Sequence, residues 1–111
     1  MSIRPLAPDF HVTGQIKPAQ MQEVAGLGYK TLICMRPDNE GFNQPAFNEV
    51  AAAAKAAGID AHHIPVAAGG AMTPEQAKRL KEIVTSRAGH VLAYCASGNR
   101  CAAAYEMAKK A

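Results

Sequence analysis

Short apolar runs and longer amphipathic segments alternate along this chain. Each apolar run is brief and is bounded by glycine or polar residues, which is typical of β-strands. Four such runs predict strands over residues 10–13, 31–35, 59–65 and 91–94. The segments that follow them have the start signals or the apolar spacing of helices. They predict helices over residues 18–28, 45–58, 73 to near 88–89, and 100–110.

Proline and glycine mark several of these helix ends. Pro18 can occupy the first turn of a helix, where its missing N–H costs nothing, and Gly28 is a natural C-terminal stop. Thr73-Pro74-Glu75-Gln76 combines a capping residue, a first-turn proline and a capping-box glutamine. These signals agree with the apolar pattern, so the alternation of strands and helices does not depend on periodicity alone.

The predicted order of elements is β-α-β-α-β-α-β-loop-α. Such alternation is typical of an α/β fold with three layers, in which helices cover both faces of a mostly parallel sheet, here of four strands. Binding sites in these sheets form at the carboxyl ends of the strands. The loops at 36–42, 66–72 and 95–100 all leave predicted strands at those ends. We therefore expect them to meet at one pocket.

Composition narrows the classes of function. The 111 residues predict a single domain over 1–111, and a hydrophobic fraction of 49% permits a core. The formal net charge of +3 is spread along the chain, which favours a small anionic substrate and argues against nucleic acid as a partner. We find no apolar stretch that would make a membrane span or a signal peptide, so we expect a cytoplasmic protein. Oligomeric state has no signature in the sequence.

The three cysteines bear on compartment and metal binding. An odd number suits a reducing compartment with reactive or buried thiols. There is no C-x-x-C pair, and the adjacent histidines 62 and 63 have no second ligand pair at zinc-finger spacing, so we expect no structural zinc. No other metal and no organic cofactor is implied.

The candidate reactive residues follow the last predicted strand, where Cys95 comes directly after Tyr94. The loop Ala96-Ser97-Gly98-Asn99 follows, and Arg100 begins the last predicted helix. Successive N–H groups in such a loop, together with the N-terminus of the helix, favour an anion, and Arg100 adds a guanidinium fork. The same field stabilises the Cys95 thiolate, which is the nucleophilic form. The alternative is a purely structural role, in which Cys95 is a buried cysteine and Arg100 is a surface arginine nearby.

Several motifs give the chain a specific resemblance. They are the cysteine loop, Thr13-Gly14-Gln15, Arg36-Pro37-Asp38, the region 41–45 and His63-Ile64-Pro65-Val66. With them the chain resembles, over nearly its whole length, the bacterial family of beta-lactamase-hydrolase-like proteins, phosphatase-like domain, also described as candidate sulfur transferases. The resemblance implies a fold like that of dual-specificity phosphatases, with a rhodanese-like fold as the alternative. It implies either phosphoester hydrolysis or transfer of sulfane sulfur.

Departures from the phosphatase pattern shape the functional prediction. Cysteine phosphatases resemble H-C-x5-R, whereas four residues separate Cys95 from Arg100 here, as in the C-x-x-G-x-R of single-domain rhodaneses. Ala67 and Ala68 stand where dual-specificity phosphatases usually carry the general acid. Loss of an acid matters little when sulfite or a thiolate leaves. We therefore rank first a sulfurtransferase that carries sulfur as a Cys95 persulfide, with thiosulfate or a persulfide as donor. A cysteine-dependent phosphatase acting on a phosphoester and a non-catalytic anion-binding module are the alternatives.

Three further residues have candidate roles. Asp38 is the substitute for the missing acid, although aspartate at such a position is more often a turn former. In the family a serine or threonine commonly follows the arginine and donates to the thiolate; Cys101 stands there instead, and one interpretation is that it is only a small apolar replacement. Cys101 and Cys34 are also candidate redox partners of Cys95, and whether either geometry permits a bond cannot be read from sequence.

Overall fold

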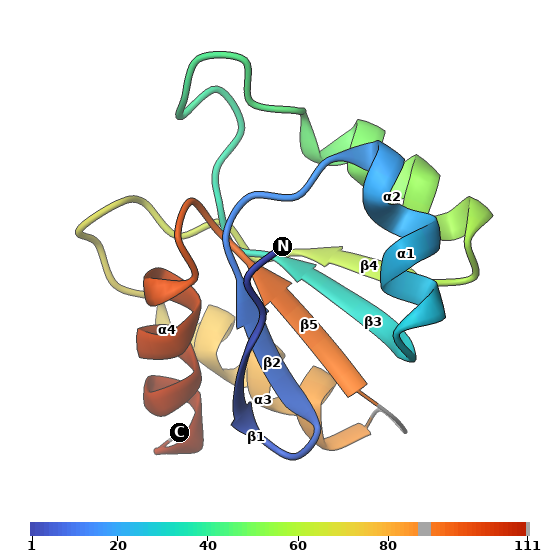
Figure 1. Cartoon of the computed structure of the whole chain (residues 1–111). Coiled ribbons are helices and arrows are strands. Elements are labelled where there is room, and N and C mark those ends of the chain that lie inside the picture. The colour runs from blue at the N-terminus through green and yellow to red at the C-terminus, as the bar shows by residue number, and fades with distance from the viewer. Residues whose placement is uncertain (87–89, 111) are drawn as a thin grey trace.

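The protein has the predicted α/β architecture, with one difference in the sheet. The computed structural model describes residues 1–86 and 90–110. In this part of the chain a single sheet contains five strands in the order β1-β2-β5-β3-β4 (Figure 1). The strands are β1 (Arg4–Ala7), β2 (Phe10–Thr13), β3 (Tyr29–Cys34), β4 (Asp60–His63) and β5 (His90–Tyr94). Strands β2, β5, β3 and β4 are mutually parallel, as predicted.

The prediction of four strands was wrong, because it missed β1. This strand pairs antiparallel with β2 at the edge of the sheet, so the sheet is mixed. Three of its four residues are exposed, and it contains Pro5. An exposed edge strand needs no apolar alternation, and proline is tolerated there because its missing N–H faces solvent. Nothing in the apolar pattern could therefore mark it as a strand.

Helices cover both faces of the sheet and build two cores. On one face α1 (Met21–Gly26) and α2 (Phe47–Ala56) pack on Leu32, Leu92 and Tyr94. On the other face α3 (Pro74–Ser86) and α4 (Asn99–Lys109) pack on Ile33 and neighbouring apolar residues. Successive residues of a strand point to opposite faces. Tyr94 therefore belongs to the first core and the next residue, Cys95, to the second.

Helix boundaries differ from the predicted ones in detail. The segment that begins at Pro18 is first a 3-10 turn, η1 (Pro18–Gln20), and only then becomes α1. Helix α2 begins two residues after Pro45, and β4 is shorter than the run 59–65. The predicted end of the third helix near residues 88–89 lies outside the described residues. The single-domain organisation over 1–111 and the cytoplasmic location stay predictions. No helix in the described ranges has the length and apolar character that crossing a bilayer requires.

Candidate active site

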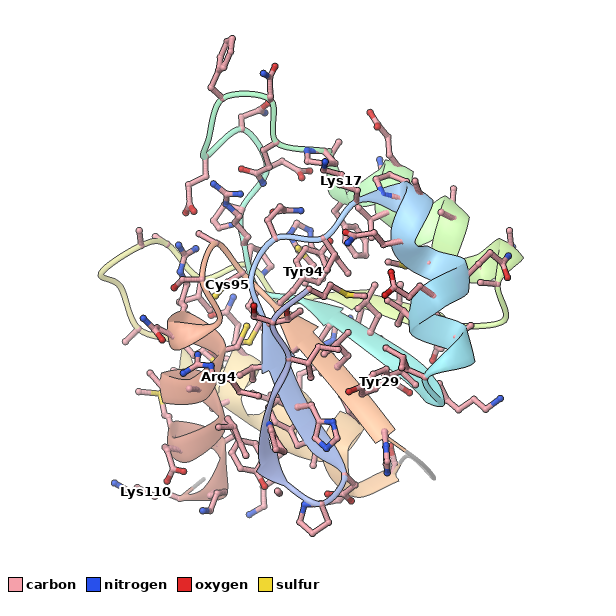
Figure 2. The ribbon with its side chains drawn as sticks, viewed as in Figure 1. Arg4, Lys17, Tyr29, Tyr94, Cys95 and Lys110 are labelled. Atoms are coloured by element: carbon pink, nitrogen blue, oxygen red, sulfur yellow. The ribbon has the colours of Figure 1, made fainter. Side chains whose placement is uncertain are left out.

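Strand β5 carries Cys95 to the carboxyl edge of the sheet, where the site lies. Figure 2 shows Cys95 just beyond the end of β5, beside the start of α4. The side chain is 1% exposed and belongs to the core beneath α3 and α4. Gly98 is the N-cap of α4, so the helix begins at Asn99, four residues after Cys95. The predicted strand-loop-helix arrangement around Cys95 is therefore present.

The environment of Cys95 favours its thiolate. The backbone N–H of Gly98 donates to Cys95 Sγ at 3.1 Å. The Cys101 thiol lowers the pKa of Cys95 most, and backbone N–H groups of residues 97, 98 and 101 add to this. Together they outweigh burial and lower the pKa to about 5. Hydrogen bonds to the charged form stabilise it, which is the reason for the direction of the shift. At neutral pH the nucleophilic form predominates.

Cys101 is the hydrogen-bond donor that completes this environment. It lies in the first turn of α4, is fully buried, and shares the core of Cys95. Its own pKa is raised, first because its proton is held by the Cys95 sulfur and second because it is buried. A neutral thiol thus faces a thiolate. The sequence predicted Cys101 as a small apolar replacement for serine or as a redox partner, and it did not predict this donor role.

Arg100 is fixed by a carboxylate that sequence reasoning missed. Its Nη1 and Nη2 donate to Glu40 Oε2 and Oε1, both at 2.9 Å, and Nη1 also donates to Val66 O at 2.8 Å. The side chains of Arg100 and Glu40 are only 14% and 21% exposed. The pairing lowers the pKa of Glu40 and raises that of Arg100. A bidentate pair of this kind fixes the plane of the guanidinium.

A second arginine holds Glu40 from the other side. Arg36 Nε donates to Glu40 Oε1 at 3.0 Å, and Arg36 Nη1 donates to Gln15 Oε1 at 3.0 Å. His63 Nε2 lies 3.0 Å from the carbonyl oxygen of Arg36. The loop after β3 is thereby tied both to the segment after β2 and to β4. Arg36 is thus part of the support for Glu40.

Asp38 lies in the same loop but is engaged elsewhere. Its Oδ1 accepts a hydrogen bond of 2.8 Å from the backbone N–H of Phe47, the first residue of α2. The first N–H groups of a helix have no partner inside the helix, so Asp38 satisfies one of them. Its role as general acid stays a prediction, and the contact observed is the structural one.

Cys34 and Cys101 lie on opposite faces of the sheet. Cys34 shares a core with Tyr94, and its Sγ donates to Arg36 O at 3.3 Å. Burial raises its pKa. The structure thus brings Cys101 together with Cys95 and puts Cys34 in the other core. All three thiols are free in the structure, and their redox roles stay predictions.

The loop conformation depends on two glycines. Gly98 has a φ of +89°, a left-handed conformation that favours glycine. A Cβ on Gly14 would lie 3.0 Å from the carbonyl oxygen of Ala96, closer than such contacts normally are. The same carbonyl accepts from Gln15 N at 3.4 Å. The Thr13-Gly14-Gln15 segment therefore packs against the cysteine loop and supports it.

A pocket of about 480 Å³ adjoins the thiolate. Its lining comes from the cysteine loop, the loop after β4 and one face of α4, and it includes Cys95 and Arg100. Two of the three loops expected to converge, 66–72 and 95–100, supply its walls, and the third contributes Glu40 through Arg100. In the described part of the chain, no three or more His, Cys, Asp or Glu side chains are grouped to hold a metal ion.

The fold and the thiolate loop together define a phosphatase-like domain of the dual-specificity type. The chain belongs to the family described as "Beta-lactamase hydrolase-like protein, phosphatase-like domain", which it matches over residues 2–111. A beta-lactamase hydrolase-like protein of Xylella fastidiosa is 31% identical over 98 residues. That alignment covers 88% of this chain and 22% of the relative. The chain thus spans about a fifth of the length of such relatives.

Solved structures agree with this assignment. A candidate phosphatase from Neisseria meningitidis is 32% identical and superposes with a TM-score of 0.83, covering 95% of this chain and 74% of that one. The active form of Tk-PTP is 18% identical with a TM-score of 0.71, covering 87% and 63%, and so shares the fold. These likenesses favour the phosphatase alternative over the sulfurtransferase that the sequence ranked first. The dual-specificity-phosphatase-like fold is confirmed over the rhodanese-like one.

Proposed function

We propose that this domain hydrolyses phosphate monoesters through the Cys95 thiolate. The observation that carries the proposal is the thiolate itself, stabilised by the loop N–H groups and Cys101 next to Arg100. An anion-binding loop and a cation beside a nucleophile suit a reaction in which negative charge must be held and orientated. The phosphatase-like descriptions of the related structures support the same reaction class.

The reaction proceeds in two displacements. Cys95 Sγ attacks phosphorus, the bond from phosphorus to the ester oxygen breaks, and the alkoxide or phenolate leaves with the bonding electrons and takes a proton from water. Water then attacks the phosphocysteine, the P–S bond breaks, inorganic phosphate is released, and the thiolate returns. The low pKa that makes Cys95 a nucleophile at neutral pH also makes it a good leaving group in the second step.

Arg100 retains donors for the phosphoryl oxygens. A guanidinium has five N–H donors, and Glu40 and Val66 accept three of those of Arg100. The two that have no partner among the described residues are Nε–H and one Nη2–H, which form the side-on fork of the group. That fork matches two oxygens of a phosphoryl group. Glu40 is accordingly a positioning residue, which holds Arg100 while this edge binds substrate.

The leaving group receives little help from the protein. Asp38 bonds to the start of α2, and alanines occupy positions 67 and 68. A general acid typically contributes about a hundredfold or more when an alkoxide leaves. Phenols leave readily without protonation. We therefore expect the domain to hydrolyse aryl phosphates much faster than simple alkyl phosphates.

A paired assay tests the proposal against the sulfurtransferase prediction. Phosphate release from an aryl phosphate and thiosulfate:cyanide sulfur transfer are measured for the wild type and for Cys95→Ser. The proposal predicts phosphate release that Cys95→Ser abolishes. Cys95-dependent thiocyanate formation without phosphate release would establish sulfur transfer instead. If neither activity is found but the domain binds an oxyanion tightly, the domain is an anion-binding module.

A further inference from the structure

The pocket beside Cys95 has a charged end and an apolar wall. Among its lining residues Arg100 is the one cationic side chain, and Cys95, Ser97 and Asn99 lie with it at the loop end. The remaining lining consists of small and apolar residues. They are Val66, Ala68, Gly69, Gly70, Ala71, Met72, Ala103, Ala104 and Met107.

One wall is a continuous stripe on α4. Residues three or four positions apart lie on the same face of a helix, so Ala103, Ala104 and Met107 continue the line that begins at Arg100. Ala104 is buried, whereas Ala103 and Met107 are exposed. A ligand whose anion binds at Arg100 would therefore extend its remaining atoms along apolar side chains.

The opposite wall is the loop between β4 and α3. From Ile64 to Met72 it contains no charged residue and no side-chain hydroxyl or amide. Arg100 Nη1 donates to Val66 O, which ties the start of this loop to α4, and Met72 is buried in the core below. Both walls thus lack side-chain partners for hydroxyl or charged groups on a substrate.

Resting on the phosphatase function proposed above, we infer that this pocket selects phosphate monoesters whose organic group is apolar. A cavity of about 480 Å³ lies in the range that encloses small organic molecules. Burial of apolar atoms against these walls is favourable, whereas burial of hydroxyl or charged groups without hydrogen bonds is costly. Sugar phosphates and polyphosphorylated polyols are therefore poor substrates, and alkyl-substituted aryl phosphates are good ones.

The test uses aryl phosphates that carry para-alkyl chains of increasing length. The leaving phenol changes little along this series, so kcat/KM reports the chain alone. Each methylene that enters the pocket should raise kcat/KM about fourfold until the pocket is full. A parallel series with para-hydroxyalkyl chains of equal length should show little or no gain. The matching phosphonates, which cannot be hydrolysed, are titrated by calorimetry against Cys95→Ser as a measure of binding without turnover.

Two variants assign the effect to this pocket. Ala103→Leu fills part of it from an exposed helical position and should abolish most of the gain per methylene. Ala52→Leu makes the same change at an exposed position of α2, outside the pocket, and should leave the gain unchanged.

The outcomes separate the two proposals. Affinity for phosphonates that does not rise with alkyl length, or that rises equally with hydroxyalkyl length, overturns the apolar-substrate inference. A rise with length that Ala103→Leu does not reduce overturns it as well. Length-dependent phosphonate binding without any phosphate release would overturn the phosphatase function and support the apolar pocket.

Discussion

Replacing Cys101 by alanine should raise the pKa of Cys95. The Cys101 thiol is the largest cause of the low pKa of about 5. Hydrogen bonds to charged groups contribute about 1.5–3 kcal/mol, and a thiol is a weak donor, so the lower value applies. About 1.4 kcal/mol corresponds to one pH unit, so Cys101→Ala should move the pKa from about 5 to about 6. Alanine is small and favours a helix, so α4 should stay folded.

Cys101→Ser is the matched control. Its hydroxyl is a stronger donor than the thiol and occupies nearly the same position. The serine variant should therefore keep the pKa of Cys95 at or below the wild-type value, while the alanine variant raises it. The pKa of Cys95 should therefore rise in the alanine variant and not in the serine variant. A general loosening of the core would not produce this difference between the two variants.

The assay is a spectroscopic titration of the thiolate. Its ultraviolet absorbance is followed against pH, and the same titration of Cys95→Ser is subtracted to isolate Cys95. Thermal melts confirm that each variant is folded across the range. An unchanged pKa in Cys101→Ala, or a rise of equal size in Cys101→Ser, would refute the reasoning that Cys101 stabilises the thiolate as a donor.

Other substitutions test the supports of the site. Glu40→Gln removes a charged bidentate partner of Arg100 and should lower kcat/KM about tenfold. The control Glu49→Gln, at an exposed position on α2, should leave kcat/KM unchanged. Equal effects of the two variants would contradict a positioning role for Glu40. Gly98→Ala forces a side chain into a φ of +89° and should cost about 1–2 kcal/mol in urea unfolding; unchanged stability would contradict this. Because the pKa of Cys95 is depressed in the folded state, wild type should gain stability relative to Cys95→Ser as pH rises from about 5 toward 9. A gain in relative stability as pH falls would contradict the depressed pKa.

The chain order and the place of the site were predictable from the sequence. Buried parallel strands read as apolar runs, and helix starts carry proline or capping residues, so alternation was visible. Because that alternation implies a parallel sheet, it also implied that the loop after Val91–Tyr94 would lie at the carboxyl edge. The prediction that Cys95 is the nucleophile rests on a glycine loop between a strand and a helix, a strictly local feature.

The partner of Arg100 was not predictable. Glu40 is 60 residues away from it in sequence, and both lie in polar loops where several carboxylates compete. The sequence drew attention to a different acid of that loop, Asp38, as the substitute general acid, and the Asp38 carboxylate accepts from the start of α2. Which acid faces inward depends on the turns between Arg36 and Gln44, where the side chain of Gln44 accepts from Gly41 N and donates to Pro37 O. Such turns are set by three-dimensional contacts that apolar periodicity does not encode.

The ranking of sulfur above phosphorus came from a loop of rhodanese-like length and from the missing general acid. A short loop and missing acid were read as evidence against phosphate esters. In the proposed reaction the thiolate, the loop donors and the free edge of Arg100 act on a substrate whose leaving group needs no acid. The missing acid thus restricts the choice of ester and does not by itself favour sulfur.

The central claim is that Cys95 attacks phosphorus, and mass spectrometry of the trapped enzyme tests it most directly. The protein is mixed with an aryl phosphate, and separately with thiosulfate, quenched within one turnover and digested. The account predicts a phosphoryl group on the peptide that contains Cys95 after the aryl phosphate. A sulfur atom on that peptide after thiosulfate, with no phosphoryl group after the aryl phosphate, would contradict it.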